Sequence, residues 1–272
     1  MQPDGTDIEA PLVDCHAHLY TVDMPLAGTA WHSPPRNAPL EDYLATLDAH
    51  GVVFGVLAAA SIYGDYNDYQ IAATRRQKRL RTTIVARPGM DRYTLEAMQR
   101  DGVVGIRLQW RHVADRPDLA CSEWRVLLRR VADLGWHVHI HDDAPRLVEP
   151  LRQLHQAGVK VVVDHFGRAD PANGLNCPGF AAILRAVEQG NTWVKLSAGF
   201  RLESPEAPAM YAGALLRHAG PERLLWGSDW PFAAFESTMT YAQAVQGLAQ
   251  WVPDARMRRR ITGETPLKLY FS

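Results

Sequence analysis

The sequence predicts a (β/α)8 barrel, because strand-length apolar runs and helical patterns alternate eight times along its 272 residues. A glycine that can end a helix recurs before the expected strands. Gly51, Gly158, Gly190 and Gly220 each follow a helical pattern and precede an apolar run. A doubly wound sheet is the alternative, but no glycine-rich turn between a strand and a helix is present to bind phosphate. No linker or shift in composition divides the chain, so we expect one domain over residues 1–272.

Short apolar runs give the expected strands, and each has the length of a buried strand in a parallel sheet. In chain order they are residues 12–18, 52–59, 82–87, 104–108, 137–141, 160–164, 193–197 and 224–228. Several of these runs end in histidine or aspartate. Polar residues at this end of a strand are unusual for a core and therefore indicate a site.

The expected helices lie between these strands, at residues 40–49, 68–79, 95–100, 123–134, 146–156, 180–188, 205–219 and 239–251. The fourth shows the pattern most clearly, because its apolar residues recur at spacings of three and four: Trp124, Leu127, Leu128 and Val131. Ser122 is expected to cap the start of this helix and Gly135 to end it. The longest irregular segment, residues 20–39, follows the first strand and includes Trp31, so we expect it to form part of a pocket wall.

Composition argues against several functional classes. Hydrophobic residues make up 47% of the chain and charged residues 22%, with a formal net charge of −1. Such a balance provides no overall field to attract nucleic acid or an anionic membrane. The dense basic run at residues 256–260 is expected to be a solvated helix face. We therefore expect a small-molecule substrate, no nucleic-acid or membrane partner, and a possible homo-oligomer.

The cysteines and the apolar runs indicate a cytoplasmic protein. Cys15, Cys121 and Cys177 form no CxxC pair, and an odd count does not fit a disulfide framework. No apolar run approaches the length of a membrane span, and the N-terminus lacks the pattern of a secretory signal.

Imidazoles and a carboxylate lie at the ends of four different expected strands. His16 and His18 close the first strand, His141 closes the fifth, His165 follows the sixth and Asp229 follows the eighth. Since catalytic groups of such barrels lie at the C-terminal ends of strands, these five residues should converge on one pocket. Histidine and aspartate at one place can donate, accept or bind a metal near neutral pH. The sequence therefore predicts an enzyme.

Five sequence elements resemble the amidohydrolase superfamily (amidohydrolase family 2). They are Asp14-x-His16-x-His18, Gly105-Ile106-Arg107-Leu108, Gly135-Trp136-His137-Val138, Asp164-His165-Phe166-Gly167-Arg168 and Gly227-Ser228-Asp229-Trp230-Pro231. Together they are most similar to the branch of 2-pyrone-4,6-dicarboxylate and sugar-acid lactonases. The resemblance implies a TIM-type barrel and the hydrolysis of a lactone without an obligatory metal.

Departures from the family pattern bear on the metal. No lysine ends the fourth strand, so the bridging lysine of two-metal members has no candidate. Phe232 stands where relatives often carry histidine, and Thr265 stands in place of a common asparagine. His16, His18, His141 and Asp229 could still hold a single Zn²⁺ with an open position. We expect no required cofactor, with one Zn²⁺ as the possible exception.

The resemblance also implies roles for individual residues. Asp229 is expected to act as the general base toward water, with His16, His18 and His165 as donors to the developing oxyanion. Arg107 and Arg201 end strands and should bind substrate carboxylates, because guanidinium groups pair with them bidentately. Ser61, His141 and Arg111 complete the expected substrate-binding set, whereas Arg168 is more typical of a rim salt bridge.

Three alternatives use the same site or the same fold. A Zn²⁺-dependent amidohydrolase or decarboxylase is favoured by His141, and an aldarolactone isomerase needs the same oxyanion pocket. A binding protein without activity on a barrel scaffold is disfavoured by the complete set of Asp229 and four site histidines.

Overall fold

Eight parallel strands form the centre of the protein, in a computed structural model that describes residues 9–272. Neighbours pair in chain order: β1 (Val13–Ala17), β2 (Phe54–Leu57), β3 (Leu80–Ile84), β4 (Val103–Gln109), β5 (His137–His141), β6 (Lys160–Val163), β7 (Thr192–Ser197) and β8 (Leu224–Gly227). A parallel bridge joins Ala17 to Trp230, and the amide of Asp229 donates to the carbonyl of His16 at 2.8 Å. The last strand thus returns to the first, and the predicted (β/α)8 barrel is confirmed.

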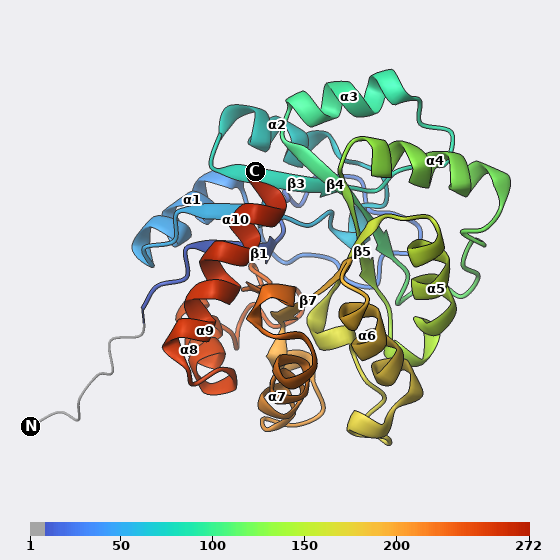
Figure 1. The fold of residues 1–272 in the computed structure, drawn as a ribbon. Helices are drawn as coiled ribbons and strands as arrows, with labels where there is room; N and C mark the ends of the chain where they lie inside the picture. Colours follow the sequence, from blue (N-terminus) through green and yellow to red (C-terminus); the bar gives the residue numbers. More distant parts are fainter. Residues whose placement is uncertain (1–8) are drawn as a thin grey trace, which may run out of the picture.

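Helices surround the barrel and follow the strands as expected (Figure 1). They are α1 (Leu40–Ala49), α2 (Asp68–Arg76), α3 (Arg92–Arg100), α4 (Ser122–Asp133), α5 (Val148–Gln156), α6 (Pro178–Glu188), α7 (Ala207–Ala219), α8 (Tyr241–Trp251), α9 (Ala255–Arg259) and α10 (Thr265–Tyr270). The apolar stripe of α4 is buried, as its spacing predicted. Gly135 follows that helix with φ of +69°. The expected cap was wrong, because Cys121 precedes the helix and Ser122 is its first residue.

The third strand ends earlier than its apolar run indicated, at Ile84 instead of residue 87. The side chain of Asn67 is the physical reason. Its Oδ1 accepts from the amide of Val85 at 2.9 Å, and its Nδ2 donates to the carbonyl of Val85 at 2.9 Å. A side chain has replaced the neighbouring strand as hydrogen-bond partner, so the ladder stops there.

The end of the chain closes the barrel from the side where the strands begin. Helix α10 lies beside β1 (Figure 1), and its buried Tyr270 belongs to the inner core of the barrel, with Val13, Val56, Val162 and Leu225. The basic run at residues 256–260 starts in α9 and is largely exposed, as expected of a solvated helix face. Among the described residues, no helix is long and apolar enough to span a membrane. The N-terminal stretch judged for a signal pattern lies mostly outside the described residues.

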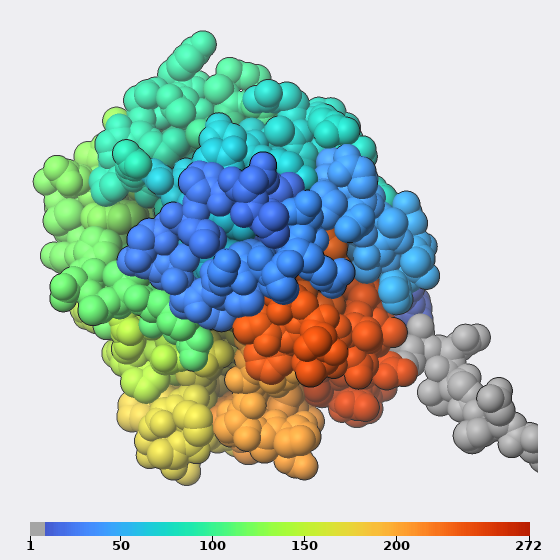
Figure 2. Space-filling view, turned by 180° about the vertical axis from the view of Figure 1, so that it is seen from behind, coloured from blue at the N-terminus to red at the C-terminus, as the bar shows by residue number. Residues whose placement is uncertain are grey.

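The segment that follows β1 covers the opposite face. Figure 2 shows this part of the chain (dark blue) lying across the centre of the molecule when it is seen from behind. An antiparallel bridge between Tyr20 and Ala38 closes the segment into a loop. Trp31 at its tip donates through Nε1 to the hydroxyl of Ser61 at 3.0 Å. The segment is therefore tied to the loop after β2, where the candidate pocket opens.

Candidate active site

A pocket opens at the C-terminal ends of the strands, where the sequence placed the site. It is lined by His18, Tyr20, Trp31, Ala60, Ser61, Ile62, Arg107, Arg111, His112, His141, His165, Arg168, Arg201, Asp229 and Ala233. Every expected site residue except His16 is in this lining, and Nε2 of His16 lies 3.6 Å from Oδ1 of Asp229. The expected wall formed by residues 20–39 is present through Tyr20 and Trp31.

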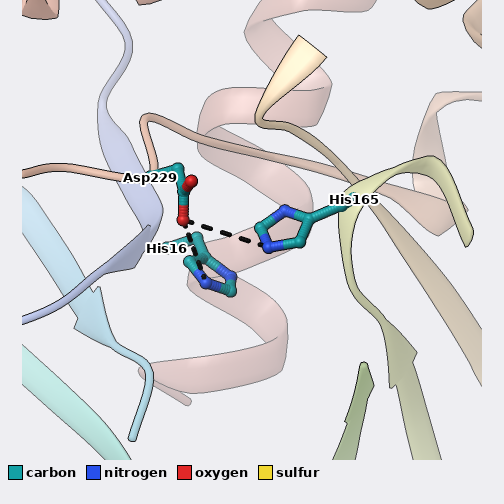
Figure 3. A group of neighbouring side chains, drawn as sticks. All are labelled: His16, His165 and Asp229. Carbon is teal, nitrogen blue, oxygen red and sulfur yellow. Dashed lines mark ion pairs between the residues drawn. The ribbon is translucent and has the colours of Figure 1, made fainter. Parts of the chain in front are cut away.

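Asp229 is the point at which the expected residues meet. Its Oδ1 lies 3.5 Å from Nε2 of His18, 3.6 Å from Nε2 of His16 and 3.9 Å from Nε2 of His165. Figure 3 shows the rings of His16 and His165 approaching this carboxylate from two sides. The other oxygen, Oδ2, accepts from Nε of Arg201 at 2.9 Å. The convergence of strand-end residues predicted from the sequence is thus present.

Close contact between β8 and β1 sets this geometry. A Cβ at Gly227 would lie 2.4 Å from the Cβ of His16, so only glycine allows the two strands to approach there. Asp14 then fastens them, accepting from the Ser228 amide at 2.9 Å and from the Ser228 hydroxyl at 2.6 Å. Asp229 itself has φ of +66°, a left-handed conformation that aspartate tolerates better than most residues. The role of Asp14 as a clamp was not found from the sequence, where it was noted only as part of the His16 motif.

The hydrogen bond made by one ring nitrogen of a histidine determines whether the nitrogen that faces the pocket is a donor or an acceptor. Nδ1 of His18 lies 2.8 Å from the carbonyl of Ala58, which can only accept, so Nδ1 carries a hydrogen. The tautomer with its one hydrogen on Nδ1 leaves Nε2 as an acceptor. Nδ1 of His165 faces the hydroxyl of Ser197 at 2.8 Å, which can donate or accept. Nε2 of His16 has no hydrogen-bond partner among the described residues.

Two of the expected substrate-binding arginines are already paired with protein carboxylates. Arg107 donates through Nε to Oδ2 of Asp164 at 3.0 Å and through an Nη atom to the Ala59 carbonyl at 2.6 Å, and its side chain is 3% exposed. Arg201 holds Asp229 and the carbonyl of Ala233. Both line the pocket, but their guanidinium groups are less free than the sequence suggested, and each orients a site carboxylate.

Arg111 and Arg168 lie at the entrance instead. Both point toward the partly exposed carboxylate of Asp143, Arg168 at 2.8 Å and Arg111 at 3.5 Å. Arg168 was expected to be a plain rim salt bridge, and it forms that bridge while also lining the pocket. The ring of Trp31 stacks on His112 at 5.2 Å beside them. We call Trp31, Arg111, His112, Asp143 and Arg168 the rim of the pocket.

A fully buried lysine was missed by the sequence analysis. Nζ of Lys195, on β7, lies 3.2 Å from Oδ1 of Asp164 and 3.1 Å from Nδ1 of His16. The signal was present, because Lys195 and Ser197 are polar residues at alternate positions of a short strand and therefore share a face. We call His16, Arg107, Asp164, Lys195 and Asp229 the floor of the pocket.

Burial and charge set the protonation states at neutral pH. Burial lowers the pKa of His16, His141 and His165 well below that of free histidine, so these rings are neutral. Burial also opposes ionisation of Asp229, but Arg201 and the neighbouring histidines outweigh it and hold the pKa of that carboxyl well below its usual range. The site therefore combines an ionised carboxylate with neutral imidazoles.

The expected zinc set is only partly assembled. Among residues 9–272, the group whose ligand atoms all lie within 4.8 Å of one another is His16, His165 and Asp229. His165 has thus replaced His18 and His141, because the loop after β6 carries its ring against His16, at 4.6 Å between centroids. Two imidazoles and a carboxylate are a suitable donor set for one Zn²⁺.

Comparison with known proteins identifies the family. The sequence pattern of the amidohydrolase family matches residues 13–271. A 4-sulfomuconolactone hydrolase from Rhizobium radiobacter is 28% identical over 268 residues, which cover 94% of this chain and 89% of the relative. A crystal structure from Pseudomonas putida, provisionally named a 2-pyrone-4,6-dicarboxylic acid hydrolase, is 36% identical with a TM-score of 0.88 and covers 97% of this chain and 98% of that one.

A second solved structure agrees with these matches. It is a probable 2-pyrone-4,6-dicarboxylic acid hydrolase from Acinetobacter baumannii with citric acid bound, 28% identical with a TM-score of 0.91, covering 96% of this chain and all of that one (100%). The resemblance carried by the five sequence elements is confirmed. The chain belongs to the amidohydrolase family of enzymes.

Proposed function

We propose that the protein hydrolyses a lactone that carries one or more acidic groups. The observation that carries this proposal is Asp229, an ionised carboxylate whose Oδ1 lies within 3.9 Å of three imidazole nitrogens, with Arg111 and Arg168 at the entrance. The relatives named above act, by their names, on 4-sulfomuconolactone and 2-pyrone-4,6-dicarboxylic acid. Both names describe cyclic esters with anionic substituents, which fits arginines at the entrance.

Asp229 and His18 are suited to hold the attacking water. Oδ1 of Asp229 and, in the tautomer with the hydrogen on Nδ1, Nε2 of His18 are both acceptors, 3.5 Å apart, and a water molecule has one hydrogen for each. Asp229 then takes one proton as the oxygen attacks the carbonyl carbon, and returns it to the ring oxygen as the ester bond breaks. This proposal gives His18 an acceptor role in place of the expected donor role, because the tautomer with its hydrogen on Nδ1 has none on Nε2.

His16 and His165 are the remaining candidates for stabilising the oxyanion. Nε2 of His16 has no hydrogen-bond partner within residues 9–272, and the Ser197 hydroxyl can donate to Nδ1 of His165, which leaves a hydrogen on Nε2 of that ring. Donors fixed in a buried site are worth more than in water, because no solvent must reorganise during the reaction. Loss of one such donor costs about 100-fold or more in rate.

Substrate carboxylates are best bound at the rim. Asp143 is about half exposed, so an incoming carboxylate can replace it against Arg168 and Arg111 at little cost. Arg201 and Arg107 contribute from deeper positions while they hold Asp229 and Asp164. Ser61 and His141 line the same space, and the hydroxyl of Ser61 already accepts from Trp31.

The charges of the site favour a reaction without a metal. Arg107 and Lys195 form ion pairs with Asp164, and Arg201 forms one with Asp229. The negative charge that would stabilise a bound divalent cation is therefore already neutralised by the protein. A Zn²⁺ ion held by His16, His165 and Asp229 would supply Lewis-acid polarisation of the carbonyl. We propose that hydrolysis proceeds without it, because the ionised base and the imidazole donors are present in the protein itself.

A lactone panel with and without a chelator tests the proposal. Acidic and neutral lactones would be compared by the release of acid, and the products would be examined by NMR for isomerisation. Hydrolysis of acidic lactones that persists in chelator is the expected result. Isomerisation without acid release would assign the aldarolactone isomerase alternative. Activity that is lost in chelator and restored by Zn²⁺ would overturn metal independence.

A further inference from the structure

Lys195 is a charged side chain at the centre of the barrel that the proposed reaction does not use. It is fully buried (0% exposed) on β7, between His16 of β1 and His139 of β5. Its Nζ lies 3.1 Å from Nδ1 of His16, 3.1 Å from Nδ1 of His139 and 3.2 Å from Oδ1 of Asp164. Burying an ammonium group is costly unless its hydrogens are all taken up, and here three acceptors surround it.

The chemistry of the ammonium group decides the state of both rings. It has three hydrogens and no lone pair, so a nitrogen 3.1 Å away must accept. Nδ1 of His16 is then bare, and the hydrogen of the neutral ring is on Nε2. The same reasoning places the hydrogen of His139 on Nε2, which lies 3.3 Å from the hydroxyl oxygen of Tyr270. Lys195 thus determines the tautomers of both His16 and His139.

The competing arrangement is less favourable. Oδ1 of Asp164 lies 3.3 Å from Nδ1 of His16 and could accept a hydrogen from it. That hydrogen would face the Lys195 ammonium group, so two donors would meet in a buried space. The charge of Asp164 is balanced without a hydrogen from His16, because Arg107 donates to its Oδ2 at 3.0 Å and the Lys195 ammonium group lies 3.2 Å from its Oδ1.

We propose that Lys195 is a positioning residue that fixes the tautomer of His16, so that the Nε2 hydrogen points at the reacting atoms. Nε2 of His16 is buried, lacks a hydrogen-bond partner among the described residues and lies 3.6 Å from Oδ1 of Asp229. A donor kept free at this place can bind the oxyanion, a role that rests on the proposed hydrolysis. The same hydrogen also makes His16 a poor metal ligand, since a ligating nitrogen must be bare.

Lys195→Met tests the effect on the reaction, because methionine has a similar length and no hydrogen to donate. His16 can then adopt the other tautomer, in which the hydrogen is on Nδ1 and is donated to Asp164. This leaves Nε2 without a hydrogen. We expect kcat to fall about 100-fold while KM changes by less than about threefold, since the rim still binds the substrate. Lys160→Met is the matched control, because this lysine begins the neighbouring strand β6 and its ammonium group donates to the Gly135 carbonyl, away from His16. A folded Lys195→Met with parental kcat would overturn the proposal.

Nitrogen NMR reads the tautomer directly and does not depend on activity. Long-range proton–nitrogen correlations of the His16 ring, assigned with a His16→Gln variant, should show the hydrogen on Nε2 in the parent and on Nδ1 in Lys195→Met. A hydrogen on Nδ1 in the parent, or an unchanged pattern in Lys195→Met, contradicts the proposal. If Lys195→Met does not fold, the parent spectrum alone decides. If the parent opens no lactone, the proposed function fails while the tautomer can still be measured.

Discussion

The floor and the rim of the pocket use the same kinds of charged side chain in opposite ways. On the floor, Arg107 and Asp164 have side chains 3% and 0% exposed and form an ion pair at 2.9 Å inside the protein. At the rim, Arg168 and Asp143 also form an ion pair, but 44% of the Asp143 side chain is exposed. A buried pair cannot exchange partners without leaving a charge unsatisfied, whereas an exposed pair can.

This difference separates two tasks of the site. The floor is fixed when the chain folds, so its charges are ready before a substrate arrives and should act on kcat and on stability. The rim is held by an exposed carboxylate that resembles the substrate's own, so it should act on KM. Arg201 lies between them, because it lines the pocket and also holds Asp229.

The largest expected effect is on the floor, from Asp229→Asn. Asparagine tolerates the positive φ of 66° at this position but cannot accept a proton from water. We expect kcat to fall at least about 100-fold with the fold retained, as measured by steady-state kinetics and circular dichroism. If the variant keeps near-parental kcat, the base lies elsewhere, and His165 is the next candidate.

Arg201→Met should change both KM and the pH profile. Loss of a charge-assisted hydrogen bond to a carboxylate is expected to raise KM roughly 10-fold or more, and to lower kcat less. The Arg201 guanidinium holds the pKa of Asp229 low, so its removal raises that pKa. Because the base works only when ionised, the acid limb of kcat should move to higher pH. An unchanged limb, or a preference for neutral lactones in the parent, would contradict this view of Arg201.

A third expectation concerns the stability of the protein at low pH and depends on His137, a buried residue at the start of β5. Burial, with a contribution from Lys195, lowers the pKa of His137 to about 3. Between pH 6.5 and 3 the unfolded chain therefore binds a proton that the folded protein does not. The free energy of unfolding should fall by about 1.4 kcal/mol per pH unit from this residue as the pH falls.

His137→Phe isolates that contribution, since both ring nitrogens of His137 lack hydrogen-bond partners among the described residues. Any cost of fitting the larger ring is independent of pH. Denaturant unfolding at several pH values should therefore give a shallower slope for the variant. Parallel slopes for the two proteins would show that His137 is protonated when folded.

The sequence predicted the barrel and the convergence of the site for one physical reason. Parallel strands in a barrel all end at one face, so polar residues at the ends of several apolar runs must meet there. His16, His165 and Asp229 were found in this way. The position of Arg107 at a strand end was also correct, but its partner Asp164 was read only as part of a motif.

What the sequence could not provide is the direction of each side chain after its strand ends. His165 and Asp229 have φ of +51° and +66°, and both lie in the compact group with His16, whereas His141 lies outside it. Lys195 was missed because a lysine on a short strand is usually placed in solvent. Tautomers were equally out of reach, since they depend on partners such as the Ala58 carbonyl, about forty residues from His18 in the chain.

The smallest expected effect comes from Asp143→Asn at the rim, which makes the same chemical change as Asp229→Asn on the floor. Asp143 competes with the substrate for Arg168, so its neutralisation should free the guanidinium group and lower KM for an acidic lactone. An exposed ion pair contributes up to about 1 kcal/mol, which limits the gain to about fivefold and makes it smaller in high salt. kcat should stay at the parental value, because the floor is untouched. In an Arg168→Met background the same substitution should have no effect on KM, whereas a gain that persists there would show that Asp143 repels the substrate directly and that Arg168 is not its binding partner.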